Sequence, residues 1–389
     1  MQDSSTRQYL IQLVKSAVSD SAPDNPPRDI DWEDLFDYAR IHRIIHLVYW
    51  GLNKLPFSVV SKIPQWNTYI MAFKMQVVDD ANRTNETSLI HSVLAANEIP
   101  HMFLKGSVTR YMYPDTSLRI MRDIDVLYGG VSDKQLIKLM EDSGYSFTDS
   151  SYKEIVMSKP DINIKVEFQK QLIDSGYEDW NNYLNKVWKK SKESSDCSYI
   201  MNHQMFLVYH IIHMAKHFIN GGIGINHIID LWLIKNNYTD INRKKLYRRL
   251  KKLGLFDFYK YFSLLAYKWF ENRELGKEAN GTVNILENYI FASGAFGNTK
   301  QQAVNEMVLH GATKSTIRSK VFPGKHKLAN YYGNAVIKYP LLRPWFWIRL
   351  NFERVFINRG SVSRGIDTVS AISTRQINAT KDLFERLGL

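Results

Sequence analysis

The sequence predicts an α+β protein in which a small mixed β-sheet lies between an N-terminal and a larger C-terminal helical region. Three observations support this prediction. Apolar residues recur three and four positions apart over residues 32–50 and 66–94, as in amphipathic helices. Between residues 101 and 169 the pattern changes to short apolar runs and alternating segments, which are typical of strands. After residue 178 the helical periodicity returns and largely persists.

The composition indicates a folded globular protein. With 389 residues the chain exceeds the usual size of one hydrophobic core, so we expect two or three packed units. The single cysteine, Cys197, excludes an internal disulfide and a cysteine-based metal centre, which fits a reducing compartment. We find no secretory leader and no uncharged apolar run of 18 residues, the length that a transmembrane segment requires. The expectation is a soluble, cytoplasmic protein.

Changes in pattern divide the chain into four expected segments. A helical region over residues 1–84 is followed by the sheet-containing core over 85–178. A helical domain over 179–310 and a basic, aromatic helical region over 311–389 complete the chain.

The expected core alternates strands with short helices. Apolar or alternating runs predict strands within residues 101–108, 124–128, 154–158 and 162–168. Between the second and third of these, Ser132 is a typical helix N-cap and Gly144 a typical stop, which predicts a helix between them. The resulting sheet should be mixed, with helices on one face.

Asp123 and Asp125 form the most informative pair in this core. Two residues apart on a strand, they project from one face, while Ile124 and Val126 enter the core. The pair offers hard oxygen ligands to a divalent cation, and Mg²⁺ suits such ligands, with Mn²⁺ as a substitute. An isolated acid pair often only solvates a strand end, so its neighbours matter.

Glu167 supplies a third carboxylate. Alternation directs Ile164, Val166 and Phe168 into the core and leaves Glu167 on the opposite face, beside the expected metal ligands. Three carboxylates holding two metal ions could activate an attacking oxygen and stabilise a leaving pyrophosphate, with the third acid helping to deprotonate the nucleophile.

Basic and small residues around the acids fit a phosphate-binding role. Gly106 and Ser107 follow an apolar run and open a short helix, so their backbone amides could meet a phosphate. Lys105, Arg119 and Arg122 could neutralise triphosphate charge, although Arg122 could equally be a solvated loop charge. The combination is stronger than any single part, because all parts occur in order within one small sheet.

This passage resembles the nucleotidyltransferase superfamily of the DNA polymerase β type, and more closely one uncharacterised nucleotidyltransferase family. The shared residues are Leu104-Lys105-Gly106, Tyr113-Pro114 and the run from Arg119 to Asp125 with Met121 inside it. Similarity extends to His213 and His217, to Asp230-Leu231, and to the basic part after Phe322-Pro323. Where the family tends to have a histidine and an arginine, this chain has Gln169 and Asn226.

The resemblance implies a magnesium-dependent enzyme that moves a nucleoside monophosphate from a nucleoside triphosphate, such as ATP, to an acceptor hydroxyl or phosphate. The family's association with surface-polysaccharide gene clusters favours a sugar or glycan-related acceptor. Transfer to RNA or to a protein side chain is the enzymatic alternative. A catalytically silent module that binds anions or RNA is the alternative from another class, although the presence of all three acids argues against it.

Two further groups remain open at this stage. His210, His213 and His217 fall on one helical face and Asp230 follows, so they could bind a transition metal, line the nucleotide cleft, or hydrogen-bond within the helical domain. From residue 311 onward, fourteen basic residues face four acidic ones. With its aromatic residues, this region could contact an anionic membrane surface or nucleic acid, or simply pack on its own core.

Overall fold

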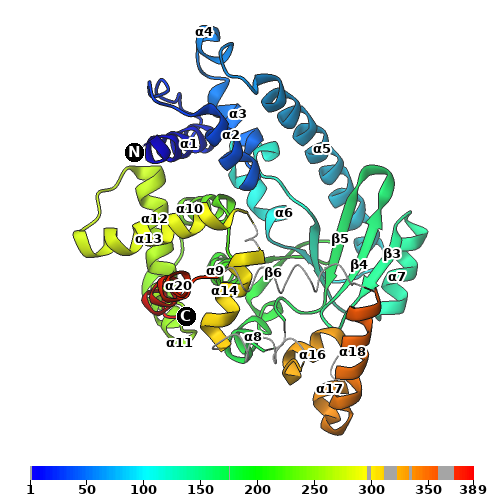
Figure 1. The fold of residues 1–389 in the computed structure, drawn as a ribbon. Coiled ribbons are helices and arrows are strands. Elements are labelled where there is room, and N and C mark those ends of the chain that lie inside the picture. Colours follow the sequence, from blue (N-terminus) through cyan, green and yellow to red (C-terminus); the bar gives the residue numbers. More distant parts are fainter. Residues whose placement is uncertain (1, 175, 296–298, 311–321, 333–334, 358–371) are drawn as a thin grey trace.

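The computed structural model describes residues 2–174, 176–295, 299–310, 322–332, 335–357 and 372–389 (Figure 1). The N-terminal part is helical, as expected. Its helices are α1 (Gln2–Val18), α2 (Trp32–Ile41), α3 (Ile45–Leu52), α4 (Phe57–Val60) and the long α5 (Trp66–Ala96). The Asp31 side chain caps α2 by accepting hydrogen bonds from two backbone amides of the first turn.

A seven-stranded mixed sheet forms the centre, which confirms the α+β class. Its strands run in the spatial order β3-β4-β5-β2-β1-β7-β6. β2 pairs with β5, and β1 with β7, in parallel, while the other neighbouring strands are antiparallel. The strands are β1 (His101–Phe103), β2 (Ile124–Tyr128), β3 (Ser146–Ser150), β4 (Glu154–Lys159), β5 (Ile164–Gln169), β6 (Ser191–Ser195) and β7 (Ser198–Met201).

The sequence did not predict three of the strands. β3 lies at one sheet edge with all five side chains exposed, so it needs no apolar alternation. β6 and β7 fall within residues expected to be helical; they form a hairpin that adds to β1 through His101 and Ser198. Every side chain of β6 is polar, and here strand pairing rather than apolar pattern determines the structure.

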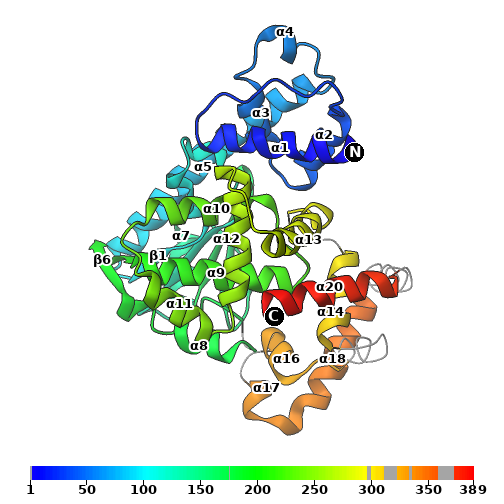
Figure 2. The same cartoon turned by 90° about the vertical axis from the view of Figure 1, so that its left-hand side faces the viewer.

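Helices cover both faces of the sheet, whereas the sequence predicted one. On one face, apolar residues of β2, β4 and β5 pack against α5 and α7 (Asp133–Asp142), which begins at a Ser132 capping box and ends before Gly144. On the other, Met102 and Leu127 belong to a larger core shared with α9 (His203–Ile219) (Figure 2). Side chains that alternate away from the α5 face therefore point toward α9.

The second helical region continues this larger core. It also includes apolar residues of α1, α2 and α3, so the division of the chain into four segments stays a prediction. Gly254, with φ +68°, separates α11 from α12 where the sequence pattern ran without a break. The helices are α8 (Glu178–Leu184), α10 (Ile225–Asn237), α11 (Arg243–Lys252), α12 (Phe256–Glu271), α13 (Lys277–Ser293) and α14 (Thr299–His310).

The described C-terminal residues belong to two cores. Leu328, Ala329, Val336 and Leu350 form a small cluster within α16 (Lys325–Tyr332), α17 (Ala335–Lys338) and α18 (Arg343–Ile357). Helix α20 (Thr374–Leu387) instead packs on α12, α13 and α14 and joins the larger core. Residues 311–321 and 358–371 of the expected basic region lie outside the described residues. In the part of the chain that the structure describes, no helix has the length and apolar character needed to cross a membrane.

Candidate active site

The parallel pairing of β2 with β5 brings two predicted site acids together. Asp125 and Glu167 are direct partners in the register, so both side chains project from the same face of neighbouring strands. Because Ile124 and Val126 enter the core beneath α5 and α7, this shared face is the one toward α9. Asp123 lies immediately before β2, and Asp125 is only 3% exposed. The three carboxylates thus form one cluster at the sheet surface.

Lys105 places its ammonium group in this cluster. It forms an ion pair with Asp125, and although burial alone would lower the pKa of Lys105, the charges of Asp125, Asp123 and Glu167 raise it above its ordinary value. The residue is the N-cap of α6 (Gly106–Thr109) and has a left-handed φ of +49°. Lysine rarely adopts this backbone conformation, so the conformation costs free energy of folding. At this position it directs the side chain toward the acids.

Burial and crowding set the protonation of the acids. Burial raises the pKa of Asp125 to about 7, a shift that Lys105 opposes and that Asp123 and Glu167 reinforce. The pKa of Asp123 is also raised, by burial and by Glu167. Burial opposes the charge of Glu167 too, but Lys105 and Lys165 outweigh it and keep its pKa below the ordinary value. Such a cluster is stabilised by any additional cation.

Two polar neighbours orient the acids. The Gln169 side-chain amide, fully buried, donates a hydrogen bond to the same Asp125 oxygen that Lys105 contacts. The Lys165 ammonium donates to a Glu167 oxygen at 2.6 Å. Both neighbours are on β5 and were visible in the sequence, but only the strand register shows which acid each one contacts.

The Gly106-Ser107 pair also has a packing role that the sequence did not predict. A Cβ on Gly106 would lie 2.9 Å from the Met121 Cγ, so the glycine permits close packing of the loop that leads to Asp123. The Ser107 amide donates to the Leu104 carbonyl at 3.1 Å, and its side chain is buried. Gly106 borders the cleft described below and Ser107 does not, and phosphate binding by their backbone amides stays a prediction.

Arg119 is engaged within the protein. Its guanidinium forms a two-pronged pair with Asp230 of α10, with Nε and Nη2 2.7–3.0 Å from the carboxylate oxygens. Nη1 donates to the Ile120 carbonyl, and the Tyr113 hydroxyl donates to Asp230 at 2.8 Å. The expected phosphate-binding arginine therefore anchors the 119–123 loop to the helical region, although it also borders the cleft.

A cleft of about 320 Å³ collects the predicted residues. Six basic and four acidic side chains border it, so it carries a positive excess that suits a polyphosphate. Arg43, Lys153 and Lys216 were not predicted; the two lysines meet at Asp174, 3.8 and 2.5 Å from its oxygens. The lining side chains with charge are Arg43, Lys105, Arg119, Arg122, Asp123, Asp125, Lys153, Glu167, Lys216 and Asp230.

Histidines of α9 and α10 form the opposite wall of the cleft. His210, His213, His217, Asn226 and His227 line it. His213 and His217 thus border the same cleft as the three carboxylates, and His227 joins them. Burial is the main cause that lowers the pKa of each of these histidines, so their imidazoles are neutral at pH 7.

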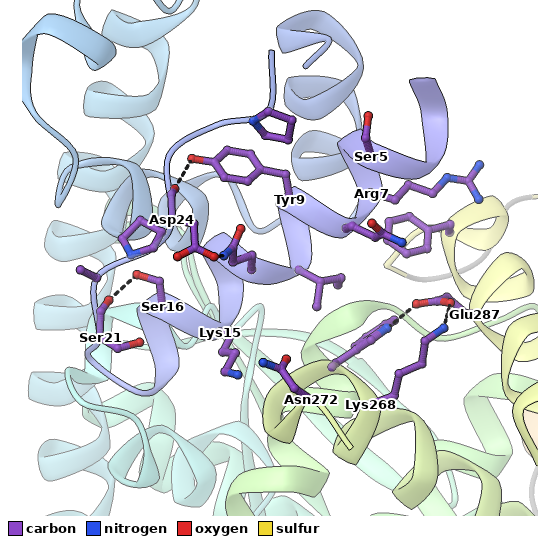
Figure 3. Close-up of a pocket in the computed structure, with 18 of the residues that line it drawn as sticks. Ser5, Arg7, Tyr9, Lys15, Ser16, Ser21, Asp24, Lys268, Asn272 and Glu287 are labelled. Atoms are coloured by element: carbon purple, nitrogen blue, oxygen red, sulfur yellow. Dashed lines mark hydrogen bonds and ion pairs between the residues drawn. The ribbon is translucent and has the colours of Figure 1, made fainter. Parts of the chain in front are cut away.

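A larger cavity of about 750 Å³ lies elsewhere, between α1 and the helices α12 and α13 (Figure 3). Within it, Glu287 accepts hydrogen bonds from Lys268 and Trp269, and Asp24 accepts one from Gln12. It borders none of the three clustered carboxylates. The smaller cleft, which combines acids, bases and histidines, is therefore the candidate active site.

Comparison with known proteins indicates the family of the chain. A family model described as an uncharacterised nucleotidyltransferase matches residues 28–271, which include the sheet, the carboxylates and both histidine-bearing helices. No curated protein matches the chain, and no solved structure does.

Proposed function

Because the chain belongs to the uncharacterised nucleotidyltransferase family, we propose that it transfers a nucleoside monophosphate from a nucleoside triphosphate to an acceptor, with magnesium held by Asp123, Asp125 and Glu167. One observation carries the proposal. Asp125 and Glu167 are register partners on parallel strands, with Asp123 two residues away, in a cleft with excess positive charge.

The carboxylate cluster fits a divalent cation. All three groups offer hard oxygen ligands, and the Lys105 ammonium already provides a positive charge at Asp125, as a stand-in for a metal ion. When bound, magnesium would supply charge stabilisation to the reacting phosphate and lower the pKa of an attacking hydroxyl. Manganese has similar ligand preferences and is expected to substitute.

The protein's own groups have distinct proposed roles in the transfer. An acceptor oxygen forms a bond to the α-phosphorus, the bond to the β-phosphate oxygen breaks, and pyrophosphate leaves. Glu167, more exposed than Asp125, takes the acceptor proton. Lys153 and Lys216 border the cleft and would neutralise phosphate charge. Lys105 would do the same once its ion pair with Asp125 is broken.

For the acceptor we propose a sugar or glycan-related hydroxyl or phosphate, on the strength of the family resemblance alone. Transfer to RNA is the second candidate. It is favoured by exposed aromatic side chains next to basic ones on α18, such as Trp345 and Arg349.

Pyrophosphate release tests the reaction. The protein is incubated with Mg²⁺ and each labelled nucleoside triphosphate, together with sugar phosphates, tRNA or cell extract, and products are identified by mass spectrometry. Asp125→Asn should lower release by at least about 100-fold, because the reacting charge loses a principal support. Asp149→Asn on the exposed edge strand β3 is the matched control and should retain activity.

The catalytically silent alternative makes the opposite prediction. A silent anion-binding module would bind triphosphate without releasing pyrophosphate with any acceptor, and Asp125→Asn would leave that binding intact. Release by Asp125→Asn at the wild-type rate, with an unchanged circular dichroism spectrum, would refute the assignment of the site.

A further inference from the structure

Three imidazoles converge at the wall of the cleft that faces the carboxylates. His213 and His217 lie one turn apart on α9, and His227 lies in the first turn of α10. Their potential ligand nitrogens all lie within 4.8 Å of one another. The ring centroids of His213 and His217 are 4.4 Å apart, and His227 lies 6.1 and 5.5 Å from them.

The turn between α9 and α10 is built to bring these rings together. Gly221 and Gly222 both have left-handed φ values, +141° and +126°, which reverse the chain within a few residues. A Cβ on Gly224 would lie 2.6 Å from the Ala295 Cα, so close packing also fixes the start of α10. The position of His227 next to the α9 histidines is therefore set by this turn and by the packing of Gly224.

We propose that His213, His217 and His227 bind one transition-metal ion of the zinc type, at a site separate from the three carboxylates. Tetrahedral zinc with Zn–N bonds of about 2.0 Å separates its ligand nitrogens by roughly 3.3 Å, which modest ring rotations would achieve here. Three protein ligands leave a fourth position open, as in catalytic zinc sites. The site stands apart from the proposed nucleotidyl transfer and does not depend on it.

The chemistry of the ligands selects the metal. Neutral imidazole suits Zn²⁺, Co²⁺, Ni²⁺ and Cu²⁺, whereas carboxylates suit Mg²⁺, so the two walls of the cleft prefer different ions. Nδ1 of His227 is buried and has no hydrogen-bond partner among the described residues, which leaves it available to coordinate a metal ion. Lys216 carries a nearby positive charge, but its ion pair with Asp174 offsets part of the repulsion.

All three histidines line the cleft, so a metal ion bound by them would be accessible to a substrate in the cleft. A bound metal would present a Lewis-acidic centre across from Asp125 and Glu167, where a phosphate or hydroxyl oxygen of a substrate could coordinate it. The ligand class at this position is therefore an oxygen anion or an alcohol.

Metal binding to the full chain, without any histidine tag, tests the proposal. The protein is stripped with a chelator and titrated with Co²⁺, whose visible absorption reports nitrogen coordination, and Zn²⁺ is then used to displace it. One equivalent should bind. X-ray absorption at the zinc edge should show imidazole scattering, and a carboxylate-only coordination shell would overturn the proposal.

His227→Gln should weaken Zn²⁺ binding by at least about 100-fold, since loss of residues that merely support a ligand already costs about 10- to 100-fold. His203→Gln is the matched control: His203 is the first residue of α9, is paired with Asp240 and is not one of the three converging histidines, so this variant should bind as wild type does. His217→Gln provides a second variant should the first lose its fold, which circular dichroism would reveal.

Two further outcomes separate this site from the catalytic one. Asp125→Asn should retain zinc binding while losing pyrophosphate release, so failure of one proposal leaves the other standing. Absence of stoichiometric binding by the wild-type protein, or equal affinity in His227→Gln, would show that the imidazoles only line the cleft.

Discussion

At the scale of single residues, Lys105 and Arg119 belong to one sequence motif but have different partners in the structure. The sequence placed both beside the same phosphate, and the structure places Lys105 at the carboxylates. Arg119 pairs instead with Asp230, which lies 111 residues further along the chain. No local pattern could predict that partner, because only the docking of α10 brings it near. We infer that Arg119 positions the loop leading to Asp123.

The Arg119 and Asp230 pair should contribute strongly to stability. Asp230→Asn would leave a buried guanidinium without its counter-charge, which typically costs about 3 kcal/mol or more in the free energy of unfolding. Urea denaturation measures this difference. Asp382→Asn, which breaks the exposed pair with Arg386, should cost less than about 1 kcal/mol. Equal losses in the two variants would contradict a structural role for the buried pair.

At the scale of elements, the sequence was most informative where side chains alternate between core and site. Ile124, Val126 and Val166 are buried as predicted, and their alternation correctly placed Asp125 and Glu167 on a common face. β6 and β7 were missed because their residues carry no apolar alternation, and their strand structure depends on pairing to β1. The sequence alone does not indicate which segments pair at the edge of a sheet.

The cleft shows the same limit. The residues from Lys105 to Asp125 come from one continuous motif and could be predicted, but Lys153, Lys216 and His227 come from three separate segments of the chain. Each of these residues is unremarkable in its own segment. His227 joins His213 and His217 only through the Gly221-Gly222 turn.

Packing of α6 against the loop before β2 makes Gly106 sensitive to substitution. Gly106→Ala should lower the free energy of unfolding by about 1–3 kcal/mol, because the new methyl group would overlap the buried Met121 side chain. It should also lower activity, since Met121 leads directly to Asp123. Urea denaturation and pyrophosphate release measure the two effects.

Two comparisons isolate the cause of the Gly106 effect. Gly281→Ala in α13, where a Cβ meets nothing within 4 Å, should instead stabilise by about 0.5–1 kcal/mol. Combining Gly106→Ala with Met121→Ala should cost less than the sum of the single changes, because the overlap is removed. Additive costs would point to another origin.

At the scale of the whole molecule, the core contains imidazoles that must stay uncharged. His42 is buried against Phe291, and His46 Nε2 is 3.0 Å from the Leu118 carbonyl oxygen, next to Arg119. Burial lowers the pKa of each to about 4. His46 therefore links the N-terminal helices to the site loop through its Nε2–H, which donates to the Leu118 carbonyl.

Stability should consequently fall as the solution is acidified. Between about pH 6.5 and pH 4 the unfolded chain binds protons at these histidines and the folded chain does not, so unfolding becomes more favourable as pH falls. The raised pKa of Asp125 acts in the opposite direction over the same range, but the four cleft histidines, whose pKa values are also lowered, add to the effect of His42 and His46. The free energy of unfolding, measured in urea at intervals from pH 7.5 to 4.5, should decline most within that window. His46→Gln should flatten the decline. An unchanged free energy from pH 7 to pH 5 would contradict this account.

The distance in sequence between Arg119 and Asp230 also has a kinetic consequence. The anchor of the loop that precedes Asp123 can form only once α10, which lies more than a hundred residues further along the chain, has docked. Closing so long a loop is slow compared with forming a helix or a hairpin. The strands that hold the acids can therefore assemble early, while the cleft becomes competent for chemistry only near the end of folding.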